Sequence, residues 1–119
     1  MDYKTKVTKI GKLVSDFAQQ DIVIVYDDNA PPELAELSVL HTVADFDEKV
    51  KIGDVVVIGD QDYVVTAVGD EVNHTLSAMG HCTLSFKGSD IAELPGHLEL
   101  RGNGVPNINP GDFFQILFT

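Results

Sequence analysis

The fold class can be predicted from residues 55–68, VVVIGDQDYVVTAV. This stretch contains two runs that are rich in β-branched side chains, Val55–Ile58 and Tyr63–Val68, and glycine and aspartate residues that favour turns separate them. Similar runs recur along the chain at residues 5–10, 22–26, 38–43, 83–86, 97–100 and 113–118. Such regularly spaced short strands predict an all-β fold, mainly an antiparallel β-barrel or a barrel-like sandwich.

The individual runs differ in pattern, and the segments between them leave little room for helix. Residues 22–26, IVIVY, are apolar throughout, which predicts a strand covered on both faces. One or two short helices are expected. The first would begin at Pro31-Pro32, because proline is tolerated in a first helical turn. The second would lie within residues 70–79 and end at Gly80, while residues 15–20 favour either a further turn of helix or a loop.

Length and composition predict a single globular domain over residues 1–119, since 44% of the side chains are apolar. No apolar run approaches the roughly 20 residues that a membrane helix needs. The amino terminus lacks the basic and then apolar pattern of a secretory signal. The one cysteine, Cys82, has no partner for an internal disulfide, which fits a reducing compartment. We therefore expect a cytoplasmic protein without direct membrane insertion.

Acidic side chains dominate the charge of the chain. Nineteen acidic residues against eight basic ones give a formal net charge of −11. This charge repels a phosphate backbone, so nucleic acid is not an expected partner. It would attract a partner with a basic surface, or it would serve solubility alone. The sequence leaves these two explanations open.

His41 is the first candidate for a chemical role, because imidazole titrates near neutral pH. It lies near the end of residues 31–42, PPELAELSVLHT, where the first short helix is expected to give way to a strand. By strand alternation, its side chain shares a face with Val39 and Val43. Residue chemistry alone favours a hydrogen-bonded structural histidine at the rim of the barrel, because a functional site needs several converging groups.

Residues 65–69, VTAVG, and 80–88, GHCTLSFKG, join residues 31–42 in a pattern that resembles a known family. That family is the glucitol/sorbitol-specific IIA component of the bacterial phosphotransferase system. The resemblance covers nearly the whole chain, from TKIG at residues 8–11 to PGD at residues 110–112.

The resemblance implies a transferase component that works through a phosphohistidine. His41 would accept a phosphoryl group from the carrier HPr on Nε2, leave Nδ1 for the scaffold to orient, and pass the group to a cysteine of a cognate IIB component. A phosphoramidate stays reactive enough to be passed on, and its transfer depends mainly on positioning. The membrane-embedded IIC component would bind the sugar alcohol. No cofactor is expected. Val39, Leu40 and Val43 would form the apolar centre of the transient interface.

His81 is the candidate supporting residue, because the junction between Gly80 and the next strand can expose a side chain at the barrel rim. It could donate a hydrogen bond to the phosphoryl oxygens or orient His41, and a buried structural hydrogen bond is an equally good explanation. His74 and His97 are expected at the solvated surface.

The histidines and the cysteine also allow two other interpretations. A metal site formed by His41, His81 and Cys82 is not expected, since their spacing matches no strong metal motif, and Cys82 favours a place in the core. The alternative function is a non-catalytic β-barrel binding module in which the histidines are structural.

Overall fold

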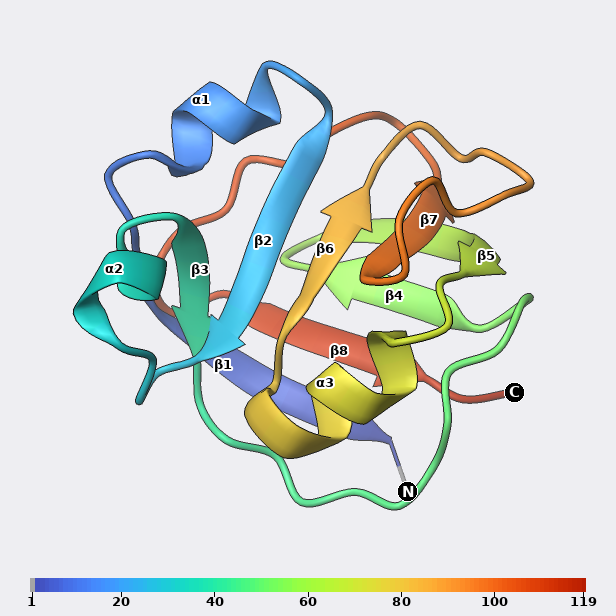
Figure 1. Ribbon diagram of the computed structural model, residues 1–119, viewed down its shortest axis with the longest axis horizontal. Helices are drawn as coiled ribbons and strands as arrows, with labels where there is room; N and C mark the ends of the chain where they lie inside the picture. The colour runs from blue at the N-terminus through green and yellow to red at the C-terminus, as the bar shows by residue number, and fades with distance from the viewer. Residues whose placement is uncertain (1) are drawn as a thin grey trace.

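In the computed structural model, which describes residues 2–119, eight strands form one closed barrel (Figure 1). The strands are β1 (Tyr3–Ile10), β2 (Ile22–Asp27), β3 (Ser38–His41), β4 (Val55–Ile58), β5 (Gln61–Val68), β6 (Cys82–Ser85), β7 (His97–Arg101) and β8 (Phe113–Leu117). Their order around the barrel is β1-β3-β2-β6-β7-β5-β4-β8. Most neighbours are antiparallel, but β2 runs parallel to β3 and β6 runs parallel to β7. The predicted all-β, mainly antiparallel barrel is confirmed.

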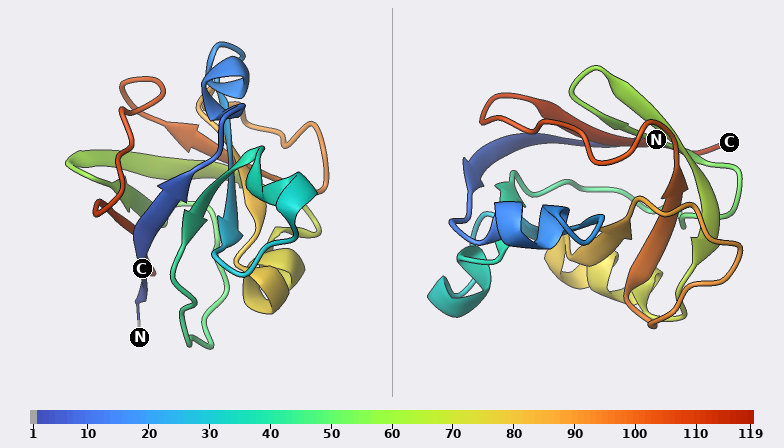
Figure 2. Two further views of the ribbon diagram at one scale, coloured as in Figure 1. Left: turned by 90° about the vertical axis from the view of Figure 1, so that its left-hand side faces the viewer. Right: turned by 90° about the horizontal axis from the view of Figure 1, so that it is seen from above.

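Three short helices accompany the barrel where the sequence predicted one or two: α1 (Val14–Ala18), α2 (Pro32–Ala35) and α3 (Val72–Met79). The extra helix is α1, in a segment whose sequence also suited a loop. α3 ends at Gly80 in the left-handed conformation, with a φ of 59°, as the sequence predicted. Figures 1 and 2 show α1 at one end of the molecule and α3 at the other. None of the helices in residues 2–119 has the length and apolar character to cross a membrane.

Side chains at alternate positions of the strands point inward, and together they fill the barrel interior as its core. In β2, Val23 and Val25 belong to this core, whereas Ile22 and Ile24 lie on the outer face and stay half-exposed. The prediction that the apolar run 22–26 is covered on both faces is therefore wrong for the first part of the strand. The reason is that α1 is the helix that packs against β2, near one end of the strand, whereas α2 packs against β3 (Figure 1).

The parallel pairing of β2 and β3 brings two segments together at one end of the barrel. In its register Asp27 lies opposite His41, at the ends of the two strands. On the other side of β2, the antiparallel partner β6 begins with Cys82 opposite Val25. The corner between α3 and β6, which contains Gly80 and His81, therefore adjoins the ends of β2 and β3.

Candidate functional site

His41 points into the end of the barrel and is fully buried. Its side chain shares the inner face of β3 with Val39, as strand alternation predicted, and its exposed fraction is 0%. Two core rings pack against the imidazole in T-shaped geometry, with centroid distances of 6.2 Å to Tyr3 and 5.4 Å to Phe114. The ring is thus fixed by packing, and solvent does not reach it in this arrangement.

Both ring nitrogens of His41 face backbone carbonyl oxygens. Nδ1 lies 2.9 Å from the oxygen of Thr42, and Nε2 lies 2.8 Å from the oxygen of Gly80. A carboxylate oxygen of Asp27 lies 3.8 Å from Nδ1. A carbonyl oxygen can only accept a hydrogen bond, so both contacts are hydrogen bonds only when both nitrogens carry a proton. The observed geometry therefore fits an imidazolium that is paired with Asp27.

Gly80 completes this arrangement because it has no side chain. A Cβ on Gly80 would collide with the carboxylate of Asp27 and would lie 2.8 Å from Cε1 of His41. Burial raises the pKa of Asp27, and the charge of Asp28 raises it further, while the nearby His41 opposes both. Asp27, His41 and Gly80 thus form one interlocked cluster, which we call the mouth cluster.

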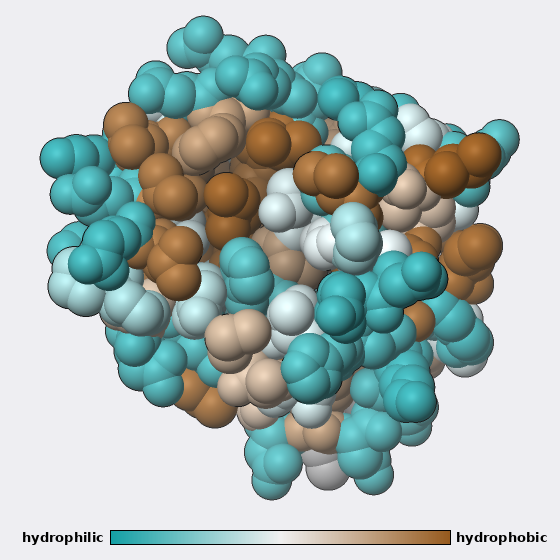
Figure 3. Space-filling model, in the orientation of Figure 1, coloured by the Kyte–Doolittle hydropathy of each residue, from teal (hydrophilic) through white to brown (hydrophobic). Residues whose placement is uncertain are grey.

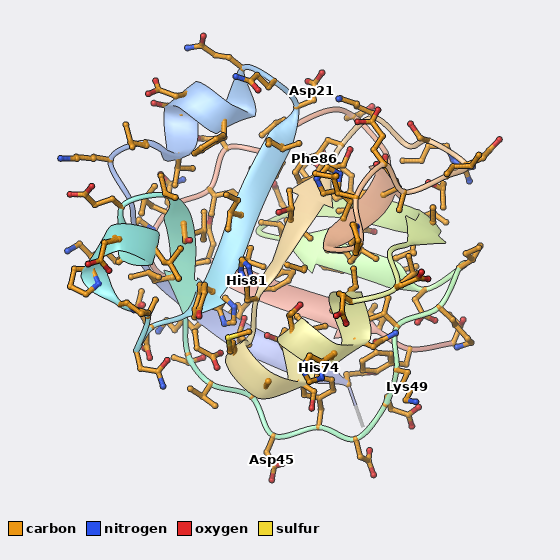
Figure 4. The ribbon with its side chains drawn as sticks, viewed as in Figure 1. Asp21, Asp45, Lys49, His74, His81 and Phe86 are labelled. Carbon is orange, nitrogen blue, oxygen red and sulfur yellow. The ribbon has the colours of Figure 1, made fainter. Side chains whose placement is uncertain are left out.

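His81 lies on the other side of Gly80 and points outward, between β2 and α3 (Figure 4). Its Nδ1 lies 3.1 Å from the carbonyl oxygen of Val25, and its ring packs on Tyr26 with a centroid distance of 4.7 Å. A neutral ring that donates from Nδ1 leaves Nε2 without a proton. His81 is only half-buried. No hydrogen bond joins the rings of His41 and His81 within residues 2–119, but both adjoin the Gly80 peptide.

The other residues that the sequence singled out have surroundings that favour a chemical role less. Cys82 is a buried core residue, and burial raises the pKa of its thiol to about 12, so it is no ready nucleophile. His74 is exposed on α3, as expected (Figure 4). His97 is half-buried, and its Nδ1 has no hydrogen-bond partner, so the prediction of a solvated surface residue is wrong for it. Within residues 2–119, no three histidine, cysteine or acidic side chains cluster as metal ligands would.

The predicted apolar interface around His41 needs correction. Val39 and Leu40 are buried, with exposed fractions of 2% and 5%, and only Val43 is exposed, at 62%. Val39 packs in the core, and Leu40 lies next to Tyr26 on the outer side of the paired strands β2 and β3. These two residues cannot offer contact area to a partner.

Sequence reasoning missed Asp27 and Tyr3. Asp27 directly follows the apolar run 22–26, and a charged residue at the end of such a strand was the one available signal. Tyr3 closes the other side of the site, and its buried hydroxyl has no hydrogen-bond partner. Burial raises the pKa of this hydroxyl, and the charges of Cys82 and Asp27 add to the effect.

Comparisons with known proteins agree with one another. The family described as the PTS system glucitol/sorbitol-specific IIA component matches residues 2–115. Glucitol/sorbitol-specific EIIA components from Shigella flexneri and Escherichia coli (strain K12) are each 32% identical over 113 residues, which cover 95% of this chain and 92% of theirs. The crystal structure of a PTS system IIA component from Enterococcus faecalis V583 superimposes with a TM-score of 0.83 at 26% identity, over 97% of this chain and 99% of that one.

Proposed function

Because the chain belongs to the family of glucitol/sorbitol-specific IIA components of the phosphotransferase system, we propose that it carries a phosphoryl group on His41. The donor in this proposal is HPr, and the acceptor is a cysteine of a cognate IIB component that works with a membrane-embedded IIC component. The sugar alcohol is glucitol or a close relative. This role belongs in the cytoplasm, with which the unpaired Cys82 agrees.

The observation that supports His41 most directly is the restraint on Nδ1. Nδ1–H donates to the Thr42 carbonyl oxygen at 2.9 Å, and the Asp27 carboxylate lies at an ion-pair distance of 3.8 Å from the same nitrogen. A fixed Nδ1–H defines Nε2 as the attacking nitrogen and stabilises positive charge on the ring. This is the orientation that the resemblance implied for a carrier histidine.

The structure also defines what must change before transfer. Nε2 lies against the Gly80 carbonyl, so it has to lose its proton and separate from this oxygen before its lone pair can attack phosphorus. The N–P bond of the donor then breaks and the Nε2–P bond forms, and the leaving nitrogen of the donor takes up a proton from solvent in place of the one that Nε2 released. The other proton of the ring stays on Nδ1, which donates it to the Thr42 oxygen. In this proposal, the observed arrangement is a closed resting state of the carrier.

His81 takes the supporting role in this proposal. A protonated His81 keeps its Nδ1–H bond to Val25 and presents Nε2–H on the other side of the ring. A donor in that position stabilises the charge on the phosphoryl oxygens during transfer. The sequence neighbour of His81, Gly80, supports this role, because its carbonyl oxygen faces Nε2 of His41.

The alternative, a non-catalytic module with structural histidines, is supported by the complete burial of His41 and by the bonding of both its nitrogens. Family membership favours the carrier. Incubation with phosphoenolpyruvate, enzyme I and HPr, followed by intact-mass measurement, distinguishes the two functions. The carrier gains one acid-labile phosphoryl group, and a wild-type protein that gains none supports the module.

The site is tested with variants that respect the burial of His41. His41→Gln keeps a polar side chain of similar length, and circular dichroism confirms that the variant is folded. His74→Gln, on the exposed surface of α3, is the matched control. We expect labelling to be lost in His41→Gln and kept in His74→Gln. Full labelling of folded His41→Gln would refute the assignment to His41.

A further inference from the structure

The outer side of β2 is an apolar strip that leads to His81. Because the two valines of β2 point into the core, Ile22, Ile24 and Tyr26 point outward. Ile22 and Ile24 are half-exposed, whereas Tyr26 is buried beside His81. The strip therefore begins at the solvent-exposed start of β2 and ends at the candidate supporting residue.

The neighbouring strand β6 widens this strip. Thr83 is the β6 partner of Ile24, so its side chain lies on the same outer face. We call the half-exposed outward side chains of Ile22, Ile24, Thr83 and His81 the β2 face; the buried Tyr26 packs beside His81 beneath it. In Figure 4, Asp21 marks its upper end and His81 its lower end. Figure 3 shows an apolar area over β2, between α1 and α2, with hydrophilic side chains around it.

The border of the β2 face is mainly acidic. Lys12, near α1, is paired with Glu36 at 3.2 Å, which offsets its charge, and Lys87 follows the end of β6. Four further acidic side chains are exposed on the segments that flank β2: Asp16 on α1, Asp21 before β2, Asp28 after β2 and Glu33 on α2. An apolar centre with a charged border is the usual anatomy of a transient protein interface.

We propose that the β2 face is the docking surface for the phosphoryl donor, a protein that presents an apolar patch bordered by lysine or arginine side chains. This inference rests on the proposed function. The lower end of the β2 face adjoins Gly80, whose carbonyl covers Nε2 of His41, so a partner that binds here lies next to the peptide that closes the mouth cluster. The acidic border and the net charge of −11 select a basic partner and speed its encounter.

The first test maps binding on the wild-type protein, so that it does not depend on any variant. Unphosphorylated HPr is titrated into labelled protein at low ionic strength, and amide chemical shifts are followed by NMR. We expect the shifts to concentrate on β2, the start of β6 and the Gly80 corner, and the affinity to fall as salt is raised. Shifts centred on the β6–β7 loop, or no shifts at millimolar HPr, would overturn the proposal.

The second test compares two isoleucines. Ile24→Lys places a positive charge in the β2 face, whereas Ile91→Lys changes an isoleucine that is 77% exposed in the β6–β7 loop. We expect Ile24→Lys to weaken HPr binding by about tenfold or more, as central interface positions do, and Ile91→Lys to leave it unchanged. Ile22→Lys, at the start of β2, repeats the test if Ile24→Lys does not fold. Wild-type affinity in a folded β2-face variant refutes the proposal.

The outcomes separate this proposal from the proposed function. A wild-type protein that is labelled with phosphate, while the β2-face variants bind HPr normally, overturns only the docking surface. A wild-type protein that binds HPr through β2 but takes no phosphate overturns only the carrier assignment.

Discussion

Replacing Gly80 by alanine tests the mouth cluster directly. Gly80 has a φ of 59°, and the left-handed conformation costs an L-residue about 1 to 2 kcal/mol. The new methyl group would also collide with the carboxylate of Asp27 and press on Cε1 of His41. Overpacking of this kind costs about 1 to 3 kcal/mol. We therefore expect Gly80→Ala to lose about 2 to 5 kcal/mol of unfolding free energy, a large part of the roughly 5 to 15 kcal/mol of a small protein.

Gly104→Ala is the matched control, because it separates the backbone cost from the cost of the contact. Gly104 also has a positive φ, of 79°, but no atom lies within 4 Å of the place where its Cβ would be. This variant should lose only the backbone contribution, about 1 to 2 kcal/mol. Urea unfolding, followed by circular dichroism and with unchanged slopes, gives both free energies.

The difference in unfolding free energy between the two variants shows whether the mouth cluster is tightly packed. A Gly80→Ala protein that loses at least about 1 kcal/mol more than Gly104→Ala supports a tightly packed mouth cluster. Equal losses would show that Asp27 and His41 leave room for a methyl group, which would refute the interlocked arrangement and with it the closed resting state.

Three further predictions follow from the site and from its surroundings. His81→Ala should slow phosphoryl transfer by roughly 10- to 1,000-fold in a rapid-quench assay without unfolding the protein, while an unchanged rate would remove His81 from the mechanism. The second-order rate constant of transfer from HPr should fall as salt is raised until the screening length is about 8 Å, with little change in the maximal rate. A rate constant that does not change with salt would show that the acidic side chains serve solubility and do not steer the partner. Burial raises the pKa of Asp54, but hydrogen bonds from Thr119 and Lys51 outweigh it and lower the pKa overall. Asp54 therefore stabilises the fold above its unfolded pKa near 3.9, and this contribution is lost as the pH falls through the lower folded value. Asp54→Asn should lower the unfolding free energy, measured in urea, by about 1 to 3 kcal/mol at pH 7 and by less at pH 3. An equal loss at both pH values would show that the ionised carboxylate of Asp54 does not stabilise the fold.

The strands could be predicted from the sequence because their signals are local. Runs such as Val55–Ile58 occupy the positions of the observed strands, and Gly80 ends a helix as its conformational freedom suggested. The direction of the His41 side chain was also predictable, since it follows from alternation with Val39 on one strand. Each of these inferences needs only neighbouring residues.

The surroundings of His41 could not be predicted, because they depend on pairing between distant segments. The parallel register that places Asp27 opposite His41 joins strands on either side of α2, and nothing in either run specifies it. The Gly80 carbonyl reaches Nε2 from a position 39 residues further along the chain. Alternation indicates which face a side chain occupies, but it does not indicate whether the end of the barrel is open or closed.

The Gly80 peptide links the two histidines physically. Its carbonyl oxygen accepts from His41 inside the barrel, and its carbon atom is bonded to the nitrogen of His81, whose ring lies outside. A movement that frees Nε2 of His41 must therefore also shift His81 or rotate the bond between them. A partner that contacts His81 on the β2 face acts on the same peptide that closes the site. Substitutions at Gly80 and His81 should consequently couple in a double-mutant cycle on transfer rate, because residues that share one hydrogen-bonded unit rarely act additively.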